Sequence, residues 1–307
     1  MGWDDSLSDS LRRHFTGRVL FDEPADIHTS IRAGGKIDAV FFPENQQELS
    51  ALLRFLRTNH IPYLPIGNWT NLIVKDGGFR GAFILLSQFR ELRDVFQGEM
   101  EVVIFAGAGC SLAELVQKAK EESLAGMEFC AGIPGSVGGA IRMNAGAFGG
   151  EIKDVIELIA ITDSGGVLKT FSHEQLNFRY RNLVLPADAV ITGGSFRLRR
   201  GDQRKIGDRI NTIIQERAKK HPLEFPNAGS IFKNPVDCPA GRLIEELGLK
   251  GVSIGDAQVS EKHGNFIVNR KKATAADILS LIEMVRRTVF EKTGRTLETE
   301  VKVVGEG

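Results

Sequence analysis

The chain has 307 residues, with 39 Lys and Arg against 39 Asp and Glu, so its formal net charge is zero. This length allows a sizeable core divided over two or three domains. A balanced charge provides no global basic field for nucleic acid or anionic lipid, so we expect neither as a partner. Any anion-binding site must therefore be local.

Cysteine usage, hydropathy and ligand spacing exclude further classes. Cys110, Cys130 and Cys238 cannot form a complete disulfide set and include no C-x-x-C pair, which favours buried thiols in a reducing cytoplasm. No apolar run approaches a membrane span, and residues 1–5 lack the basic-then-apolar pattern of a signal peptide. The six histidines do not pair with cysteines at ligand spacing, so we expect no metal site.

The first two thirds of the chain mix strands with helices. Asn45 with Glu48 and Ser111 with Glu114 predict the capped starts of two helices. Strands are predicted at residues 38–42, 83–86, 102–105, 158–162, 167–171 and 189–198. This order indicates an α+β region with its core at about 31–200.

The composition changes near residue 200. Residues 199–205 are charged and predict a strand-free hinge before an amphipathic helix at 206–219. The predicted elements that follow are a helix at 242–247 ended by Gly248, a strand at 265–268, a helix at 275–292 capped by Thr274 and Asp277, and a strand at 299–304. We therefore predict domains at 1–204 and 205–297, and a terminal segment at 298–307.

The most distinctive stretch is 131–150, Ala-Gly-Ile-Pro-Gly-Ser-Val-Gly-Gly-Ala-Ile-Arg-Met-Asn-Ala-Gly-Ala-Phe-Gly-Gly. It shows neither strand alternation nor the apolar stripe of a helix, and dense glycine indicates close backbone approach. It predicts a loop whose amides lie against a large flat ligand. A Gly-rich surface loop is the alternative, which Ile133, Val137, Ile141 and Met143 disfavour because they would anchor the loop in a core.

Residues 132–140 and 144–149 of this stretch resemble the UDP-N-acetylenolpyruvoylglucosamine reductase family, flavoenzymes that complete UDP-N-acetylmuramate synthesis for bacterial cell walls. The resemblance extends from about residue 31 to residue 304. It implies an α+β FAD-binding domain of the vanillyl-alcohol-oxidase (PCMH) type and a smaller α/β substrate-binding domain. The terminal segment is then expected to end beside the active site.

Residues 65–74, Pro-Ile-Gly-Asn-Trp-Thr-Asn-Leu-Ile-Val, resemble the family's pyrophosphate loop. Small and polar residues let amides reach phosphate, whereas Trp69 replaces a second glycine that is common there and does not favour positive φ. No histidine lies in either glycine loop, so the implied FAD is noncovalent, and no Rossmann G-x-G-x-x-G is present. The expected cofactor-binding residues are Gly67, Asn68, Thr70, Asn71, Gly132, Ile133, Pro134, Gly135, Ser136, Gly138, Gly139, Asn144 and Gly146.

Three separate segments match the family's catalytic motifs: 178–181, 227–235 and 297–301. The resemblance implies that Arg181 binds the substrate carboxylate and stabilises the intermediate, that Ser230 donates a proton, and that Glu300 is the catalytic glutamate.

The chemistry fits these residue types. Hydride addition to an enolpyruvyl ether builds negative charge beside a carboxylate, which the planar fork of an arginine stabilises. A positioned serine is acidic enough to protonate an enolate carbon. By type alone each residue would be a surface charge or a turn hydroxyl, and Glu298, two residues from Glu300 on the same predicted strand face, is the alternative glutamate.

The expected substrate contacts are Tyr180, Lys219, Asn234 and Gln258. The short link between residues 182 and 191 leaves little room for the tyrosine-bearing insertion that one branch of the family has. We predict an FAD-dependent reductase that uses NADPH and acts on UDP-N-acetylglucosamine enolpyruvate. The alternatives are a flavin oxidase of the same fold acting on an alcohol or sugar, and a non-enzymatic flavin or nucleotide-sugar binding protein. The sequence predicts no oligomeric state.

Overall fold

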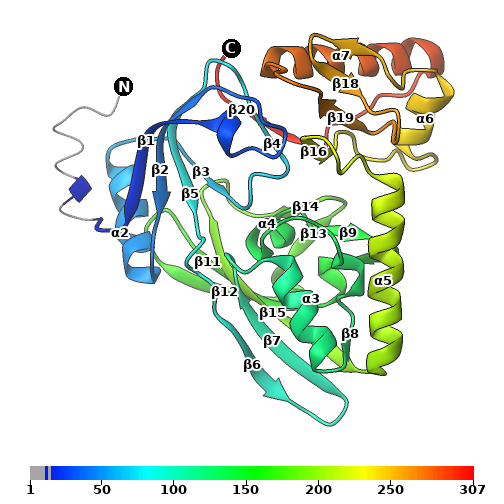
Figure 1. Cartoon of the computed structure of the whole chain (residues 1–307). Coiled ribbons are helices and arrows are strands. Elements are labelled where there is room, and N and C mark those ends of the chain that lie inside the picture. Colours follow the sequence, from blue (N-terminus) through cyan, green and yellow to red (C-terminus); the bar gives the residue numbers. More distant parts are fainter. Residues whose placement is uncertain (1–10, 13–14) are drawn as a thin grey trace. The chain divides into compact units, whose positions relative to one another are not determined.

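The computed structural model describes residues 11–12 and 15–307 (Figure 1). Residues 1–5, where the sequence lacks a signal pattern, lie outside this part. The described residues pack into two compact units: unit 1 comprises residues 11–12, 15–21, 39–68 and 81–216, and unit 2 comprises residues 22–38, 69–80 and 217–307. The domain limits predicted from the sequence (1–204, 205–297 and 298–307) divide the chain into continuous segments, whereas each compact unit combines several segments. These domain limits stay a prediction.

Unit 1 contains a sheet of antiparallel strands in the order β12-β11-β15-β7-β6, with β8 also paired to β15. Helices α3 and α4 lie over this sheet (Figure 1). Their apolar faces form one core with the sheet and with Ile206, Ile210 and Ile213 of α5. The elements are β6 (Leu92–Gln97), β7 (Glu101–Gly107), α3 (Leu112–Glu121), β8 (Leu124–Ala125), α4 (Val137–Arg142), β11 (Ile156–Thr162), β12 (Leu168–Ser172), β15 (Val190–Arg200) and α5 (Gln203–Lys220).

A second sheet has the strand order β1-β2-β5-β3, with β3 parallel to β5. Helix α2 buries Leu49, Leu52, Leu53 and Leu56 in a core with Phe41 of β2. The elements are β1 (Arg18–Pro24), β2 (Lys36–Phe42), α2 (Gln46–Thr58), β3 (Tyr63–Ile66) and β5 (Phe79–Leu85). Two short hairpins lie within unit 1: β9 (Gly146–Ala147) with β10 (Gly150–Glu151), and β13 (Asn177–Arg179) with β14 (Asn182–Val184).

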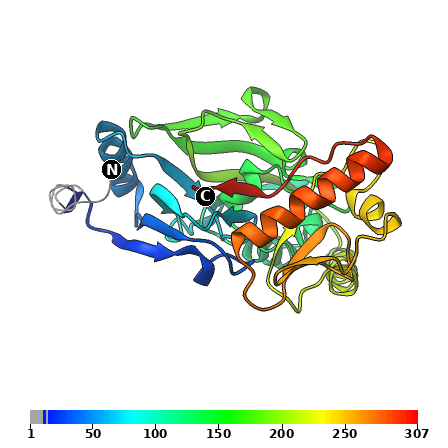
Figure 2. The same ribbon diagram turned by 90° about the horizontal axis from the view of Figure 1, so that it is seen from above.

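Unit 2 has a sheet in the order β16-β19-β18-β17, on which α7 packs through β17 and β18 (Figure 2). Strand β20 pairs in parallel with β4, so that Lys302 lies opposite Leu72. Thr274 and Asp277 form the capping box predicted for α7, and left-handed Gly294 ends the helix. The elements are β4 (Leu72–Val74), β16 (Asn227–Ser230), α6 (Ala240–Glu246), β17 (Ser253–Ile254), β18 (Ala257–Val259), β19 (Phe266–Asn269), α7 (Ala275–Thr293) and β20 (Lys302–Val304).

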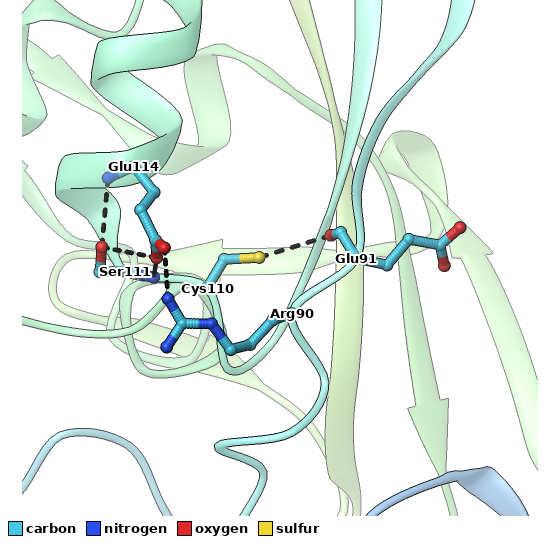
Figure 3. Close-up of polar contacts among 5 residues, drawn as sticks. All are labelled: Arg90, Glu91, Cys110, Ser111 and Glu114. Atoms are coloured by element: carbon cyan, nitrogen blue, oxygen red, sulfur yellow. Dashed lines mark hydrogen bonds and ion pairs between the residues drawn. The ribbon is translucent and has the colours of Figure 1, made fainter.

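The two other predicted helix caps are also confirmed, whereas the helices predicted to start at residues 206 and 242 start at Gln203 and Ala240. Asn45 accepts the Glu48 N–H, and Ser111 and Glu114 cap each other reciprocally (Figure 3). Arg90 pairs with the Glu114 carboxylate, and the Cys110 thiol donates to the Glu91 carbonyl at 3.4 Å. Burial raises the pKa of the Cys110 thiol. Cys110 and Cys130 are buried free thiols, whereas Cys238 is partly exposed.

The predicted hinge at residues 199–205 is wrong. Strand β15 continues to Arg200, because Arg199 pairs with Glu101 and Arg200 with Leu124. Helix α5 starts at Gln203, and the Asp202 carboxylate accepts the N–H groups of Arg204 and Lys205 at its start. Charged side chains indicate solvent contact, and they do not exclude backbone pairing at a sheet end.

Two further predictions need correction. The stretch 131–150 contains helix α4, which buries Val137, Ala140 and Ile141, so a short apolar stripe is present after all. The strand predicted at 299–304 is regular only over Lys302–Val304. Thr299 instead makes an isolated bridge with Phe232.

Among the described residues, no helix is both long and apolar enough to cross a bilayer. The same residues hold no group of three or more His, Cys, Asp or Glu side chains arranged to bind a metal ion.

Candidate active site

The two glycine-containing loops approach each other within unit 1. A Cβ atom on Gly67 would lie 2.6 Å from Ser136 Oγ and 3.6 Å from Gly139 Cα. No side chain fits there, so the backbones of the two loops lie nearly in contact. At Gly135, in contrast, a Cβ atom would meet nothing within 4 Å. The loops therefore form one cradle with an open face, and this arrangement fits the flat rings and pyrophosphate of FAD.

The loop at 132–139 is fixed by bonds to the start of α3. Leu112 N–H donates to the Gly135 carbonyl, and Gly138 N–H donates to the Ala108 carbonyl, each at 3.0 Å. Ser136 Oγ accepts the Gly139 N–H at 3.3 Å and so caps α4. A Cβ atom on Gly138 would lie 2.8 Å from the Cβ atom of Ala108. Close packing against Ala108 therefore explains why a glycine occupies this position. The expected cofactor contacts of Ser136 and Gly138 stay predictions.

Arg142 follows the glycines of α4 and was not singled out by the sequence. It lies one turn after Gly138 and Gly139, on the same face of α4. Its Nη1 atom is buried without a hydrogen-bond partner in the described part of the chain, and burial lowers the pKa of its guanidinium. Burying a charged nitrogen without a hydrogen-bond partner is costly, so this atom fits an acceptor group of FAD.

Asn144 joins the glycine stretch to the β13–β14 hairpin. The residue is 0% exposed. Its Nδ2 donates to Glu151 Oε2 at 3.0 Å and to the Arg179 carbonyl at 3.1 Å, while its Oδ1 accepts the Lys153 N–H at 3.0 Å. The amide is thus fully used inside the protein as a brace, and a cofactor contact at Asn144 stays a prediction.

Arg181 lies in the two-residue turn of that hairpin. Its backbone is left-handed, with φ 56°. Its Nη1 donates to the Gly146 carbonyl at 2.8 Å, and the guanidinium carbon lies 5.2 Å from the centre of the Tyr180 ring, which is 44% exposed. Burial acts to raise the pKa of Glu151, but hydrogen bonds from Lys153 and Asn144 and the charge of Arg181 lower it. The structure therefore brings Arg181 together with Asn144 and Gly146.

Asn71, Ser230 and Glu300 meet in unit 2. Glu300 N–H donates to the carbonyl of Ile231, directly after Ser230, at 2.8 Å. Asn71 Nδ2 donates to the Glu300 carbonyl at 3.2 Å. Gly229 has φ 76°, and the Ser230 hydroxyl has no hydrogen bond to the described residues. The available hydroxyl and the glutamate thus lie on one framework, joined to the predicted pyrophosphate loop through Asn71.

The structure separates the two candidate glutamates. Glu298 has a side chain that is 72% exposed and lies 3.1 Å from Lys233 Nζ. Glu300 is partly buried and precedes β20. The two glutamates do not lie on one regular strand. The argument that Glu298 and Glu300 share a strand face, which made Glu298 the alternative, therefore does not apply here.

The expected substrate contacts have varied surroundings. Asn234 Oδ1 accepts the Ala240 N–H at 3.0 Å and so holds the start of α6. Gln258 Nε2 donates to the Gly251 carbonyl at 3.0 Å. Lys219 is exposed near the end of α5, close in sequence to His221, whose pKa burial lowers to about 4. Their contacts with substrate, like that of Tyr180, stay predictions.

The link after the hairpin is short. Residues 185–189 alone separate β14 from β15, which leaves no room there for an inserted tyrosine loop. This agrees with the expectation that the chain lacks the tyrosine-bearing insertion of one branch of the family.

Comparisons with known proteins cover most of the chain. A family model described as an FAD binding domain matches residues 37–172, and one described as the C-terminal domain of UDP-N-acetylenolpyruvoylglucosamine reductase matches residues 221–304.

Individual relatives match along nearly their whole length. The UDP-N-acetylenolpyruvoylglucosamine reductase of Syntrophus aciditrophicus is 50% identical over 99% of this chain and 97% of its own. The reductase of Geobacter metallireducens is 44% identical over 99% of each chain. A crystal structure of the enzyme from Thermus caldophilus gives a TM-score of 0.78 at 34% identity, covering 94% of this chain and 98% of that one.

Proposed function

The chain belongs to the UDP-N-acetylenolpyruvoylglucosamine reductase family, and from this we propose that it reduces UDP-N-acetylglucosamine enolpyruvate to UDP-N-acetylmuramate with FAD and NADPH. The product is a precursor of peptidoglycan. The fold class expected from the sequence, an FAD-binding α+β region followed by a substrate-binding domain, is that of the family.

One observation carries the proposal: the cofactor cradle and the substrate-binding cation share a scaffold. Gly67 and Gly139 form the cradle, and Arg181 is bonded to Gly146 of the same glycine stretch. When bound, FAD accepts hydride from NADPH and delivers it to the substrate. A cation fixed at a set position beside the cradle suits a reaction in which charge develops on the substrate carboxylate.

The chain's own residues then perform three tasks. Arg181 binds the carboxylate and stabilises the added charge as hydride reaches the methylene carbon. Ser230 gives its proton to the adjacent carbon, which completes the addition of one hydride and one proton. Glu300 orients the charged groups of the reaction. Hydrogen bonds with Ile231 and Asn71 fix its backbone for this role.

We assign the nucleotide-sugar end of the substrate to Tyr180, Lys219, Asn234 and Gln258. A reaction in the cytoplasm accords with free cysteines at 110, 130 and 238. The available Ser230 hydroxyl favours a reductase over an oxidase of the same fold class. A reductase must protonate a carbon atom of its substrate, whereas oxidation of an alcohol requires no such proton donor.

The test is a two-step anaerobic experiment on the purified protein. NADPH should bleach the yellow flavin, and the enolpyruvyl nucleotide should restore its colour without oxygen. Acid or heat should release the FAD, because no histidine lies in either loop. Bleaching that is reversed by oxygen but not by the enolpyruvyl nucleotide would overturn the reductase and favour the oxidase.

A further inference from the structure

Trp69 has an unusual backbone for a large residue. Its φ is 56°, in the left-handed region, within the Gly67–Asn71 loop. A residue with a Cβ atom is strained there relative to glycine, so other contacts must hold the conformation. The Trp69 side chain is buried, at 7% exposure. The fold therefore provides a binding place for the indole.

His28 stacks on the indole of Trp69. The imidazole and indole ring centres lie 5.0 Å apart, with their planes inclined by 22°. His28 Nε2 donates to Glu23 Oε1 at 2.5 Å, which fixes the imidazole in its plane. Ser30 N–H donates to the Trp69 carbonyl at 3.1 Å. Residues 23–30 thus hold both the side chain and the backbone of Trp69, and all these residues belong to unit 2.

The resemblance assigns this loop to FAD binding. A binding loop works well when its conformation is formed before the ligand arrives, since less ordering then accompanies binding. A glycine at position 69 would adopt the conformation without an anchor. A tryptophan has to be held in it.

We propose that Trp69 and His28 act as one positioning unit that holds the loop at residues 67–71 in the conformation that binds FAD. The inference rests on FAD binding, and it adds residues that touch the loop rather than the reacting atoms. Its distinctive consequence is coupling: His28 matters to FAD affinity because residue 69 is tryptophan.

The experiment is a double-mutant cycle on the full-length apoprotein in a Trp3→Phe background, where Trp69 is the remaining tryptophan. FAD affinity is measured by quenching of flavin fluorescence for the parent, His28→Ala, Trp69→Gly and the double variant. We expect His28→Ala to weaken FAD binding about three- to tenfold in the parent, which corresponds to one aromatic stack. In the Trp69→Gly background the same change should alter affinity less than about twofold.

His28→Phe keeps a stacking ring but removes the bond to Glu23, and it guards against a misfolded alanine variant. We expect FAD affinity within about threefold of the parent, and Trp69 emission close to that of the parent. An equal loss from His28→Ala in both backgrounds, or no loss in either, would overturn the positioning unit. A parent protein that binds no FAD would instead overturn the proposed function itself.

Discussion

Arg181 and Ser230 both lie where the backbone turns left-handed, but the two regions place the turn on different residues. In the β13–β14 hairpin the left-handed residue is Arg181 itself, with φ 56°, whereas before Ser230 it is Gly229, with φ 76°. A non-glycine residue in this region costs about 1–2 kcal/mol. The hairpin offsets this cost by bonding Arg181 to Gly146 and by the brace of Asn144.

The difference matches the two proposed roles. A cation that stabilises developing charge works best when it is fixed in advance, and Arg181 is held through its backbone and side chain. A proton donor needs a hydroxyl that is free to reach its target, and the strain beside Ser230 is left to a glycine. Backbone strain is therefore placed on Arg181, the residue whose position matters most for the proposed reaction.

The largest expected effect is that of Ser230→Ala. Reoxidation of the flavin by the enolpyruvyl substrate should slow by about 10²–10⁴-fold, because the proton donor is lost. Reduction by NADPH needs no protein acid and should keep nearly the parent rate. Stopped-flow absorbance separates the two steps, and equal slowing of both would refute the assignment.

Arg181→Lys should slow the same oxidative step by about 10²–10³-fold and weaken substrate binding, since the planar two-point contact is lost. Single-turnover kinetics at varied substrate concentration measure both effects. Arg179→Lys is the matched control from the same hairpin, where the side chain is exposed and the carbonyl makes the bond to Asn144. A comparable loss in that control would mean that hairpin charge, and not Arg181, is responsible.

Asn144→Ala removes the brace and deprives Glu151, Lys153 and Arg179 of one part-buried hydrogen bond each. We expect unit 1 to lose about 1–3 kcal/mol of unfolding free energy, measured by denaturant titration. Hydrogen exchange should rise at residues 177–184, because the Arg179 carbonyl loses its bond. Exposed Asn177 in the same hairpin gives the control, and Asn177→Ala should leave both measurements near those of the parent.

The smallest effect is expected from Gly229→Ala. A Cβ atom there would meet nothing within 4 Å, so the cost is that of the backbone alone, about 1–2 kcal/mol. Denaturant titration of the holoenzyme measures it. A much larger loss would show that the region before Ser230 is as tightly constrained as the hairpin, and the contrast between the two sites would disappear.

Local features of this fold could be predicted from the sequence, and distant ones could not. The caps at Asn45, Ser111 and Thr274 were predictable because their partners lie three residues away. Composition indicated a binding loop at residues 131–150, whereas only the family resemblance indicated one at residues 65–74, and the contacts of both with FAD stay predictions. The family resemblance, and no local pattern, pointed to Arg181, Ser230 and Glu300.

The rest depends on contacts between remote segments. The charge of residues 199–205 suggested a hinge. The strand pairing that overrides this pattern, of Arg199 with Glu101, joins distant positions and could not be predicted locally. Trp69 suggested a loop that departs from the usual glycine geometry. The stack with His28 that supports Trp69 joins segments 41 residues apart (69 − 28), so no local pattern indicated it. Asn144 was assigned to the cofactor because nothing in the sequence indicates that its amide is consumed by Arg179 and Glu151.

The pairing of β20 with β4 has a consequence for the protein during its synthesis. Lys302 lies opposite Leu72, so the two partners are made 230 residues apart (302 − 72). At roughly 5–20 residues per second, β4 leaves the ribosome about 10–50 s before its neighbour exists. An unpaired strand edge invites association with other chains. Asn71 and Glu300, which are bonded in the finished fold, are likewise separated in time, so this bond forms only after residue 300 has been made.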